Sequence, residues 1–397
     1  MRKQEKPQKS IYLDYASTTP VDPDVLAAMG PYFSKQYANP SSLHTMGRSA
    51  HEAVEQARKE VTECLNCSEE EIVFTSGGTE SDNIAILGLA SVLAEKGING
   101  TIICSEIEHH AIIDSVKATE KFGFKTKLLL VDKNGIVDLK ALEEMLKKGD
   151  VKLVSIMYAN NEIGTIQPVA KAGALCKKHG AVFHTDACQA TPYLNLDVAE
   201  LNVDMLTLNG SKMYGPKGVG LLYVRKGVEL APVIFGGGQE RGLRSGTENV
   251  PGIVGLAKAL SLAQKIRHEE SKREEALRNQ LIDELLSIPK TVLNGDRGYR
   301  LPNNANISFL GVEGEALLLE LDRAGIFVST GSACSSKSLE PSHVIMAIHK
   351  ADTEPHAYAH SSIRFTLGKY TTAENIDYTV KAVKTAVEKL RSISSAW

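Results

Sequence analysis

The chain has 397 residues, 43% hydrophobic and 23% charged, the balance of a globular protein with about two or three domains. Its net charge of −3 gives no basic surface for nucleic acid, and no apolar run approaches the roughly 20 residues that span a bilayer. Six cysteines in so long a chain do not indicate a disulfide framework, so we expect a cytoplasmic protein without a membrane anchor or a direct nucleic-acid partner.

Residues 1–10 are charged and lack the apolar stretch of a signal peptide, so they are predicted to form a tail. Beyond them, short apolar runs alternate with amphipathic helical patterns over the first two thirds of the chain. Strands are predicted over residues 71–75, 101–105, 127–131, 153–157, 181–185, 205–208 and 219–224. Helices are predicted between several of them, over residues 83–96, 139–147 and 169–179. This alternation predicts an α/β fold with a mainly parallel central sheet covered by helices on both faces.

The pattern changes after the glycine-rich stretch 236–251. A long charged helix is predicted over about residues 252–288, then strand-like segments at 304–310 and 361–367, and a final helix from Ala373. This mixture is typical of a smaller α+β domain. We therefore divide the chain into an N-terminal segment that packs on the small domain (1–20), a large domain (21–255) and a small C-terminal domain (256–397).

Polar and small residues gather where the predicted parallel strands end, which is where such sheets bind ligands. The turn at residues 76–79, Ser-Gly-Gly-Thr, opens a helix, so its free backbone N–H groups would favour an anion such as phosphate. The same residues would equally make a plain tight turn before a threonine cap. The chain has neither GxGxxG nor GxxxxGK[ST], which disfavours dinucleotide and P-loop proteins.

Lys212, Asp186 and His109 also follow predicted strands. A lysine beside small residues can act as an amine nucleophile, and a buried aspartate can stabilise a protonated pyridine nitrogen. With the phosphate turn, these are the parts that a pyridoxal-phosphate (PLP) enzyme needs. His109 would stack on the cofactor ring and shuttle protons, or else cap a helix at the surface.

Cys334 lies in a run of small residues, TGSACSSKS, without a strand pattern. Such a loop suits thiolate chemistry, although a lone loop cysteine can also be inert. No metal site is predicted. Cys64 and Cys67 have zinc spacing but no second ligand pair, and His356 and His360 lack the glutamate of HExxH.

The motifs of this chain resemble those of one family over nearly its whole length. YLDYASTTP (12–20) and SSIRFTLGKYTT (361–372) enclose, among others, GGTESDN (77–83), EHHA (108–111), NNEIGTIQP (160–168), SKMYGPKGVG (211–220), RGLRSGTEN (241–249) and SACSSKSLEPSHV (332–344). In this order they resemble the cysteine desulfurases, PLP enzymes of the class V aminotransferase group. The resemblance implies a fold-type I PLP-dependent transferase that acts as a homodimer.

The resemblance also implies roles for individual residues. Lys212 would hold PLP as a Schiff base, Asp186 would pair with its pyridinium nitrogen, and His109 would stack over the ring and assist proton transfer. The other implied cofactor contacts are Gly78, Thr79, Asn160, Gln189, Asn209, Ser211 and, from a second subunit, Thr247.

The implied substrate is L-cysteine, with its carboxylate held by Asn160 and Arg364. Cys334 would take the sulfur as a persulfide, release alanine and pass the sulfur to an iron–sulfur scaffold protein or a tRNA-thiolation acceptor. Some positions depart from the family: Asn209 and Ser211 lie in NGSK where many relatives have SGHK. Gln239 replaces a frequent histidine, and Ser17 replaces the usual alanine.

Three alternatives remain open at this point. Another class V enzyme, such as a selenocysteine lyase or an aminotransferase, would keep the cofactor but not need Cys334. A non-catalytic assembly subunit would keep the fold alone, and the intact Lys212, Asp186, His109 and Arg364 argue against it. An NAD-binding protein is disfavoured by the missing glycine fingerprint.

Overall fold

The structure, a computed structural model, describes residues 10–330 and 340–393. Its larger part is built on a seven-stranded sheet in the order β2-β8-β7-β6-β5-β3-β4. Six strands run in the same direction, and β8 runs in the opposite direction. The strands are β2 (Ile72–Thr75), β3 (Thr101–Ser105), β4 (Lys125–Leu129), β5 (Val151–Ser155), β6 (Val182–Asp186), β7 (Met205–Asn209) and β8 (Gly220–Val224). The predicted mainly parallel sheet is confirmed, although β4 and β5 begin two residues earlier than expected.

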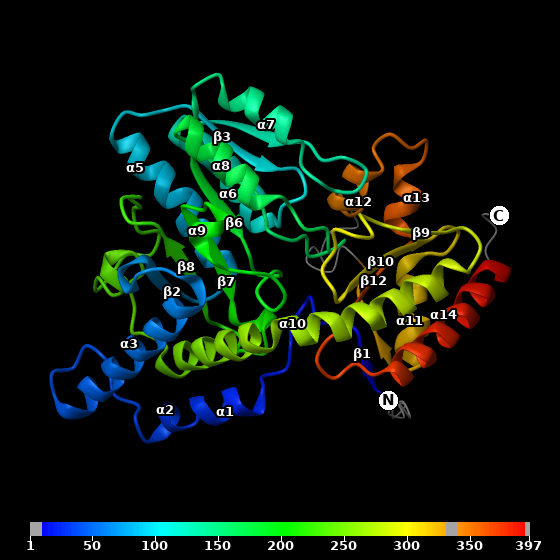
Figure 1. The fold of residues 1–397 in the computed structure, drawn as a ribbon, viewed down its shortest axis with the longest axis horizontal. Coiled ribbons are helices and arrows are strands. Elements are labelled where there is room, and N and C mark those ends of the chain that lie inside the picture. Colours follow the sequence, from blue (N-terminus) through cyan, green and yellow to red (C-terminus); the bar gives the residue numbers. More distant parts are fainter. Residues whose placement is uncertain (1–9, 331–339, 394–397) are drawn as a thin grey trace.

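Helices pack on both faces of this sheet (Figure 1). The helices of the larger part are α1 (Pro23–Met29), α2 (Pro31–Ser34), α3 (Thr45–Leu65), α4 (Gly78–Asn83), α5 (Leu89–Glu95), α6 (His110–Ala118), α7 (Leu139–Leu146), α8 (Val169–His179) and α9 (Val198–Leu201). A π-helical segment, Ile84–Gly88, joins α4 to α5 without a break.

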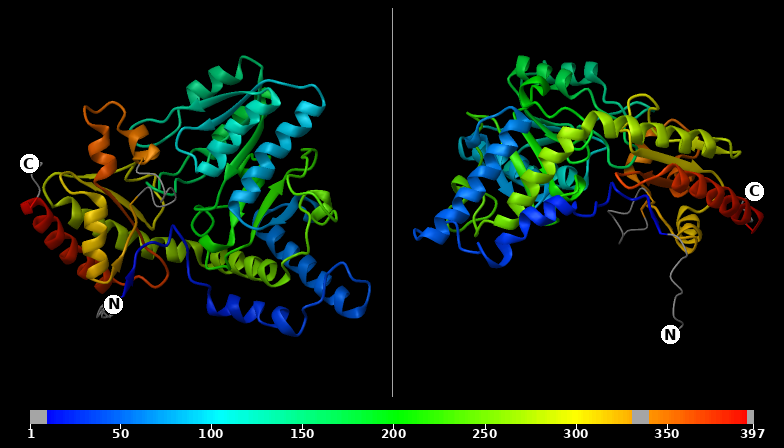
Figure 2. Two further views of the ribbon diagram at one scale, coloured as in Figure 1. Left: turned by 180° about the vertical axis from the view of Figure 1, so that it is seen from behind. Right: turned by 60° about the horizontal axis from the view of Figure 1, so that its bottom comes forward.

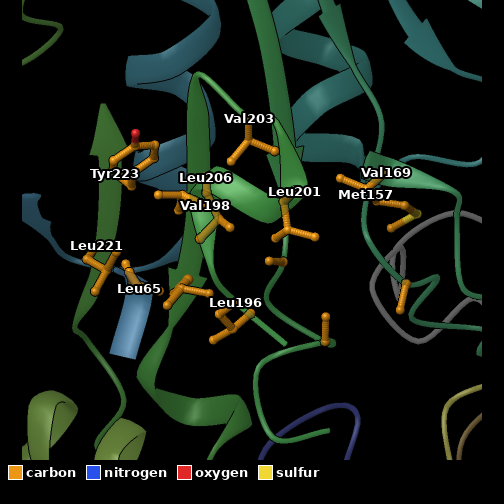
Figure 3. Close-up of a cluster of buried hydrophobic side chains, with 14 of the residues drawn as sticks. Leu65, Met157, Val169, Leu196, Val198, Leu201, Val203, Leu206, Leu221 and Tyr223 are labelled. Atoms are coloured by element: carbon orange, nitrogen blue, oxygen red, sulfur yellow. The ribbon is translucent and has the colours of Figure 1, made fainter. Parts of the chain in front are cut away.

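Consecutive strand residues point to opposite faces, and each face has its own apolar core. Val73 and Ile102 belong to the core under the π-helical segment, α5 and α6, whereas Phe74 and Ile103 belong to the larger core on the other face. Figure 3 shows part of the larger core, where side chains of β7, β8, α3 and α9 meet. Because both faces are covered, the central strands are buried along nearly their whole length, whereas the edge strand β4 is largely exposed.

The C-terminal part contains an antiparallel sheet in the order β12-β10-β9. Its elements are β9 (Thr291–Leu293), β10 (Asn304–Phe309), α11 (Gly314–Arg323), β11 (Ile326–Phe327), α12 (His343–Ile348), α13 (Pro355–His360), β12 (Ser362–Thr366) and α14 (Ala373–Ile393). A separate apolar core lies between this sheet, α11 and α14. This arrangement has the α+β character expected for the end of the chain.

The long helix α10 (Val250–Leu286) connects the two parts, as both views in Figure 2 show. It passes through residue 255, where the sequence suggested a domain boundary, so the exact boundaries stay a prediction. The N-terminal strand β1 (Ile11–Tyr12) pairs in parallel with β11, and Ile11 and Leu13 join the C-terminal core. Residues 11–13 therefore pack in the C-terminal part, although α1, the next helix in sequence, belongs to the larger part.

Over the described residues, no helix combines the length and apolar character required to cross a membrane. Within the same ranges, no group of three or more His, Cys, Asp or Glu side chains is placed to hold a metal ion.

Candidate active site

A cavity of about 190 Å³ lies at the carboxyl edge of the large sheet. Lys212, Asp186 and His109, which the sequence placed at strand ends, line it together. Its other lining residues are Ala16, Gly78, Thr79, Asp82, Met157, Ala159, Asn161, Cys188, Gln189, Asn209 and Arg364. Segments far apart in the sequence thus converge on one space, the arrangement typical of ligand sites in open α/β sheets.

Lys212 lies in the short 3-10 turn Gly210–Lys212 that follows β7. Its Nζ donates hydrogen bonds to the carbonyl oxygens of Ala16 at 2.8 Å and Ser17 at 2.6 Å. Both acceptors belong to the N-terminal segment. The amine is thereby held at the cavity, where a primary amine can condense with an aldehyde.

Asp186 ends β6, and its carboxylate accepts a hydrogen bond from the backbone N–H of Cys188 at 2.9 Å. The thiol of Cys188 also bonds to this carboxylate, and burial together with the nearby Asp186 raises the pKa of the thiol. Cys188 is therefore a protonated hydrogen-bond donor rather than a nucleophilic thiolate. The carboxylate of Asp186 is placed to pair with a cationic nitrogen in the cavity.

His109 is the N-terminal cap of α6, because its Nδ1 accepts a hydrogen bond from the backbone N–H of Ala111 at 3.1 Å. A neutral ring in this arrangement carries its proton on Nε2. Burial lowers the pKa of His109, although Asp186 opposes the effect. The neutral ring can exchange a proton at Nε2. The residue both caps a helix and lines the cavity, so the two interpretations left open by the sequence are not exclusive.

The turn between β2 and α4 needs glycine at two positions. Gly77 has φ 154° and ψ 178°, a conformation that only glycine adopts readily. A Cβ added to Gly78 would lie 2.8 Å from the Sγ of Cys188. Gly78 and Thr79 line the cavity at the start of the helix that runs through α4 and α5. Unpaired N–H groups at such a start favour an anion.

Polar side chains brace this turn and the neighbouring one. Glu80 accepts hydrogen bonds from the backbone N–H of Ser76 at 3.0 Å and from the Nε of Arg244 at 2.9 Å. Beside it, Asn209 accepts from the backbone N–H of Ser211 at 3.2 Å and from its hydroxyl at 3.3 Å. The departures from the family in NGSK therefore still make a hydrogen-bonded turn before the lysine.

Arg364 enters the cavity from β12 and is 1% exposed. Its Nη1 donates to the carbonyl oxygen of Asn161 at 2.9 Å, and its Nη2 donates to Asp14 Oδ1 at 2.8 Å and Ser17 Oγ at 2.7 Å. Its Nε is buried and has no hydrogen-bond partner in the part of the chain that the structure describes. A buried guanidinium N–H lacking an acceptor fits an anionic ligand such as a carboxylate.

The remaining expected site residues differ from one another in their position relative to the cavity. Gln189 lines the cavity and donates to a carbonyl of the N-terminal segment at 2.9 Å. Asn160 is fully buried with both ends of its side chain bonded to backbone groups, and its neighbour Asn161 lines the cavity, so the expected role of Asn160 stays a prediction. Thr247 is exposed on this chain, so its role at a partner's site stays a prediction. Cys334 lies outside the described residues.

Two buried carboxyl groups near the cavity had no role in the sequence analysis. Burial, aided by Asp186, raises the pKa of Asp82, whose Oδ1 has no hydrogen-bond partner among the described residues. Burial raises the pKa of Glu108 to about 8, and its Oε1 accepts from the backbone N–H of Met157 at 2.8 Å. Both residues lie in motifs that the sequence singled out, but residue type alone does not indicate burial.

A family model for class V aminotransferases matches residues 11–379. The chain belongs to this family. Cysteine desulfurase IscS of Dictyoglomus turgidum is 48% identical to this class V member over 388 residues, 98% of this chain and 97% of the relative. Cysteine desulfurase IscS of Methanosarcina thermophila is 48% identical over 386 residues, 97% and 94% of the two chains.

Solved structures agree with this assignment. A NifS-like protein aligns with a TM-score of 0.89 and 39% identity, covering 96% of this chain and 100% of its own. A structure of SspA in complex with cysteine aligns with a TM-score of 0.79 and 36% identity, covering 91% and 100%. The resemblance to class V enzymes and the expected α/β fold class, with the fold-type I architecture, are therefore confirmed.

Proposed function

We propose that this class V protein is a PLP-dependent cysteine desulfurase that converts L-cysteine to L-alanine. The observation that carries the proposal is the convergence of Lys212, Asp186, His109 and Arg364 on one cavity. An amine, a carboxylate, an imidazole and a guanidinium are the groups needed for an aldehyde cofactor with a ring nitrogen and an amino-acid substrate. The extensive similarity to chains named cysteine desulfurase supports the same activity.

The residues present fit PLP. Lys212 would bind its aldehyde carbon, and Asp186 would pair with its ring nitrogen. The backbone N–H groups at Gly78 and Thr79 would hold the phosphate. Glycine is needed at residue 78 because a Cβ there would collide with the thiol of Cys188. When bound, PLP supplies an electron sink that weakens the bonds at the α-carbon of an amino acid.

The chain's own residues would then bind and orient L-cysteine. Arg364 would hold the substrate carboxylate through its Nε, which has no other acceptor among the described residues. Lys212 and His109 would carry protons, the latter at Nε2, because its Nδ1 is used in capping α6.

Cys334 would perform the sulfur transfer. Its thiolate attacks the sulfur of the bound cysteine, and the carbon–sulfur bond of the substrate breaks. The electron pair of that bond stays on the substrate carbon, which takes up a proton and becomes the methyl group of alanine. Cys334 keeps the transferred sulfur as a persulfide, which a sulfur acceptor or an added thiol then removes.

The wider setting of the enzyme belongs to the same proposal. We assign it to the cytoplasm as a homodimer, in which the exposed Thr247 of each subunit would reach the phosphate of its partner. The acceptor would be an iron–sulfur scaffold protein or a tRNA-thiolation protein, as the SACSS context of Cys334 suggests.

The decisive experiment measures alanine and sulfide released from L-cysteine by the purified protein with PLP and a thiol reductant. We expect matching amounts of both products. Cys334→Ala should abolish their release but keep the PLP absorbance band, and Lys212→Ala should lose that band. Release of alanine by Cys334→Ala at the wild-type rate would refute the persulfide route, and a protein that stays colourless with PLP would refute the cofactor.

A further inference from the structure

The N-terminal turn formed by residues 14–17 contacts three polar side chains of the cavity. Its backbone carbonyls accept hydrogen bonds from Lys212 and Gln189, and its side chains accept from Arg364. The sequence drew attention to this turn only because Ser17 replaces the alanine usual in relatives. The structure gives that hydroxyl two hydrogen-bond partners at the cavity.

Asp14 Oδ1, Ser17 Oγ and Arg364 Nη2 form a nearly equilateral triangle with sides of 2.7, 2.8 and 2.8 Å. The serine hydroxyl donates its hydrogen to Asp14 and accepts one from the guanidinium. Seen from Nη2, the two acceptors lie much closer together than the roughly 120° between its two N–H bonds. Both acceptors therefore engage the Nη2 corner of the guanidinium, while the buried Nε has no acceptor in the described part of the chain.

We propose that Ser17 is a positioning residue for the substrate carboxylate, because its hydroxyl fixes Asp14 at one corner of the Arg364 guanidinium. This inference rests on the proposed function, which makes Arg364 the carboxylate site. The side chain of Asp14 is 19% exposed and so has room to turn. Without the hydroxyl, it can move to the Nε edge and take the bidentate position that a substrate carboxylate needs. Asp14 would then compete with the substrate.

Two probes that differ only in the carboxylate test this role. L-Alanine carries the carboxylate, and ethylamine is the same molecule without it. Their binding to the PLP-loaded protein is followed by the change in cofactor absorbance, so no turnover is required. Ser17→Ala should weaken the binding of L-alanine about fivefold, the size expected for the loss of one hydrogen bond, and leave that of ethylamine unchanged.

Two further variants separate positioning from a general structural effect. Ser17→Thr keeps the hydroxyl and should bind L-alanine as the wild type does. Asp14→Asn added to Ser17→Ala removes the competing charge and should restore most of the lost affinity.

Three results would overturn the proposal: unchanged L-alanine affinity in Ser17→Ala, equal weakening for both probes, or no recovery in the double variant. Failure of the proposed function looks different. In that case, the wild type releases no alanine from L-cysteine, whatever the variants do to the binding of the two probes.

Discussion

Replacing Gly78 by alanine tests whether the turn before α4 holds the cofactor phosphate. A Cβ at this position would lie 2.8 Å from the Sγ of Cys188, whereas optimal contacts between heavy atoms are about 3.5–4.0 Å. The turn or the thiol must therefore move by roughly 1 Å, and overpacking of this kind costs about 1–3 kcal/mol. If the strain falls on the phosphate site, PLP affinity should decrease by about 5- to 150-fold.

The assay is a titration of the apoprotein with PLP, followed by absorbance, with thermal unfolding measured in parallel. Cys188→Ala removes the colliding atom, and the next atom near the new Cβ is 3.6 Å away on Asn209. The double variant should therefore recover most of the affinity lost by Gly78→Ala. Gly77→Ala is the matched control, because no atom lies within 4 Å of its Cβ and its strain comes from φ 154°.

The steric argument would be refuted if Cys188→Ala rescued Gly77→Ala as well as Gly78→Ala, or rescued neither. Wild-type PLP affinity in Gly78→Ala would show that the phosphate does not bind at this turn.

Two further predictions concern buried charges. Glu240→Ala should lower the free energy of unfolding by about 3 kcal/mol in chemical denaturation, since it removes the buried carboxylate 2.9 Å from Arg58 and leaves that guanidinium with the partly exposed Glu55, 3.2 Å away, as its one carboxylate among the described residues. Glu229→Ala breaks the exposed pair with Lys96 and should cost less than about 1 kcal/mol, so equal losses would contradict this reasoning. Burial raises the pKa of Glu108 from 4.5 to about 8, so the full stability is present below about pH 4.5 and is lost progressively as the pH rises to about 8. Glu108→Gln should therefore gain stability relative to the wild type as the pH rises from about 4.5 to about 8, with no further gain above that value, and a constant difference over this window would show that the pKa of the buried carboxyl is not raised.

The sheet could be predicted because its central strands are buried on both faces and therefore read as apolar runs. Strand β3 begins and ends at the expected residues, and the ends of β7 and β8 lie within one residue of those expected for each. The edge strand β4 was expected over 127–131, where apolar residues concentrate, but it occupies Lys125–Leu129. Its limits follow from backbone pairing with β3, which a pattern of side chains does not record.

The site was predictable only in part. Lys212, Asp186 and His109 could be placed together because they follow strands of one parallel sheet. The resemblance selected Asn160, whereas the structure shows its neighbour Asn161 lining the cavity, so the role of Asn160 stays a prediction. Which of the two faces the cavity depends on the turn that follows β5. This turn is fixed by two hydrogen bonds to residues distant in sequence: Asn160 Nδ2 donates to the carbonyl oxygen of Ile107, and the carbonyl oxygen of Asn161 accepts from Arg364 Nη1.

The N-terminal turn, residues 14–17, explains why the site needs the whole chain. It reaches Arg364 across 350 positions of sequence and Lys212 across 196, so it links the guanidinium of the C-terminal part to the amine of the large sheet. The helix α10 connects the same two parts, but these hydrogen bonds and the pairing of β1 with β11 tie the N-terminal segment to both. No local pattern encodes such contacts. The fold therefore followed from short stretches of sequence, whereas the reaction could be recognised only from motifs spread over its full length.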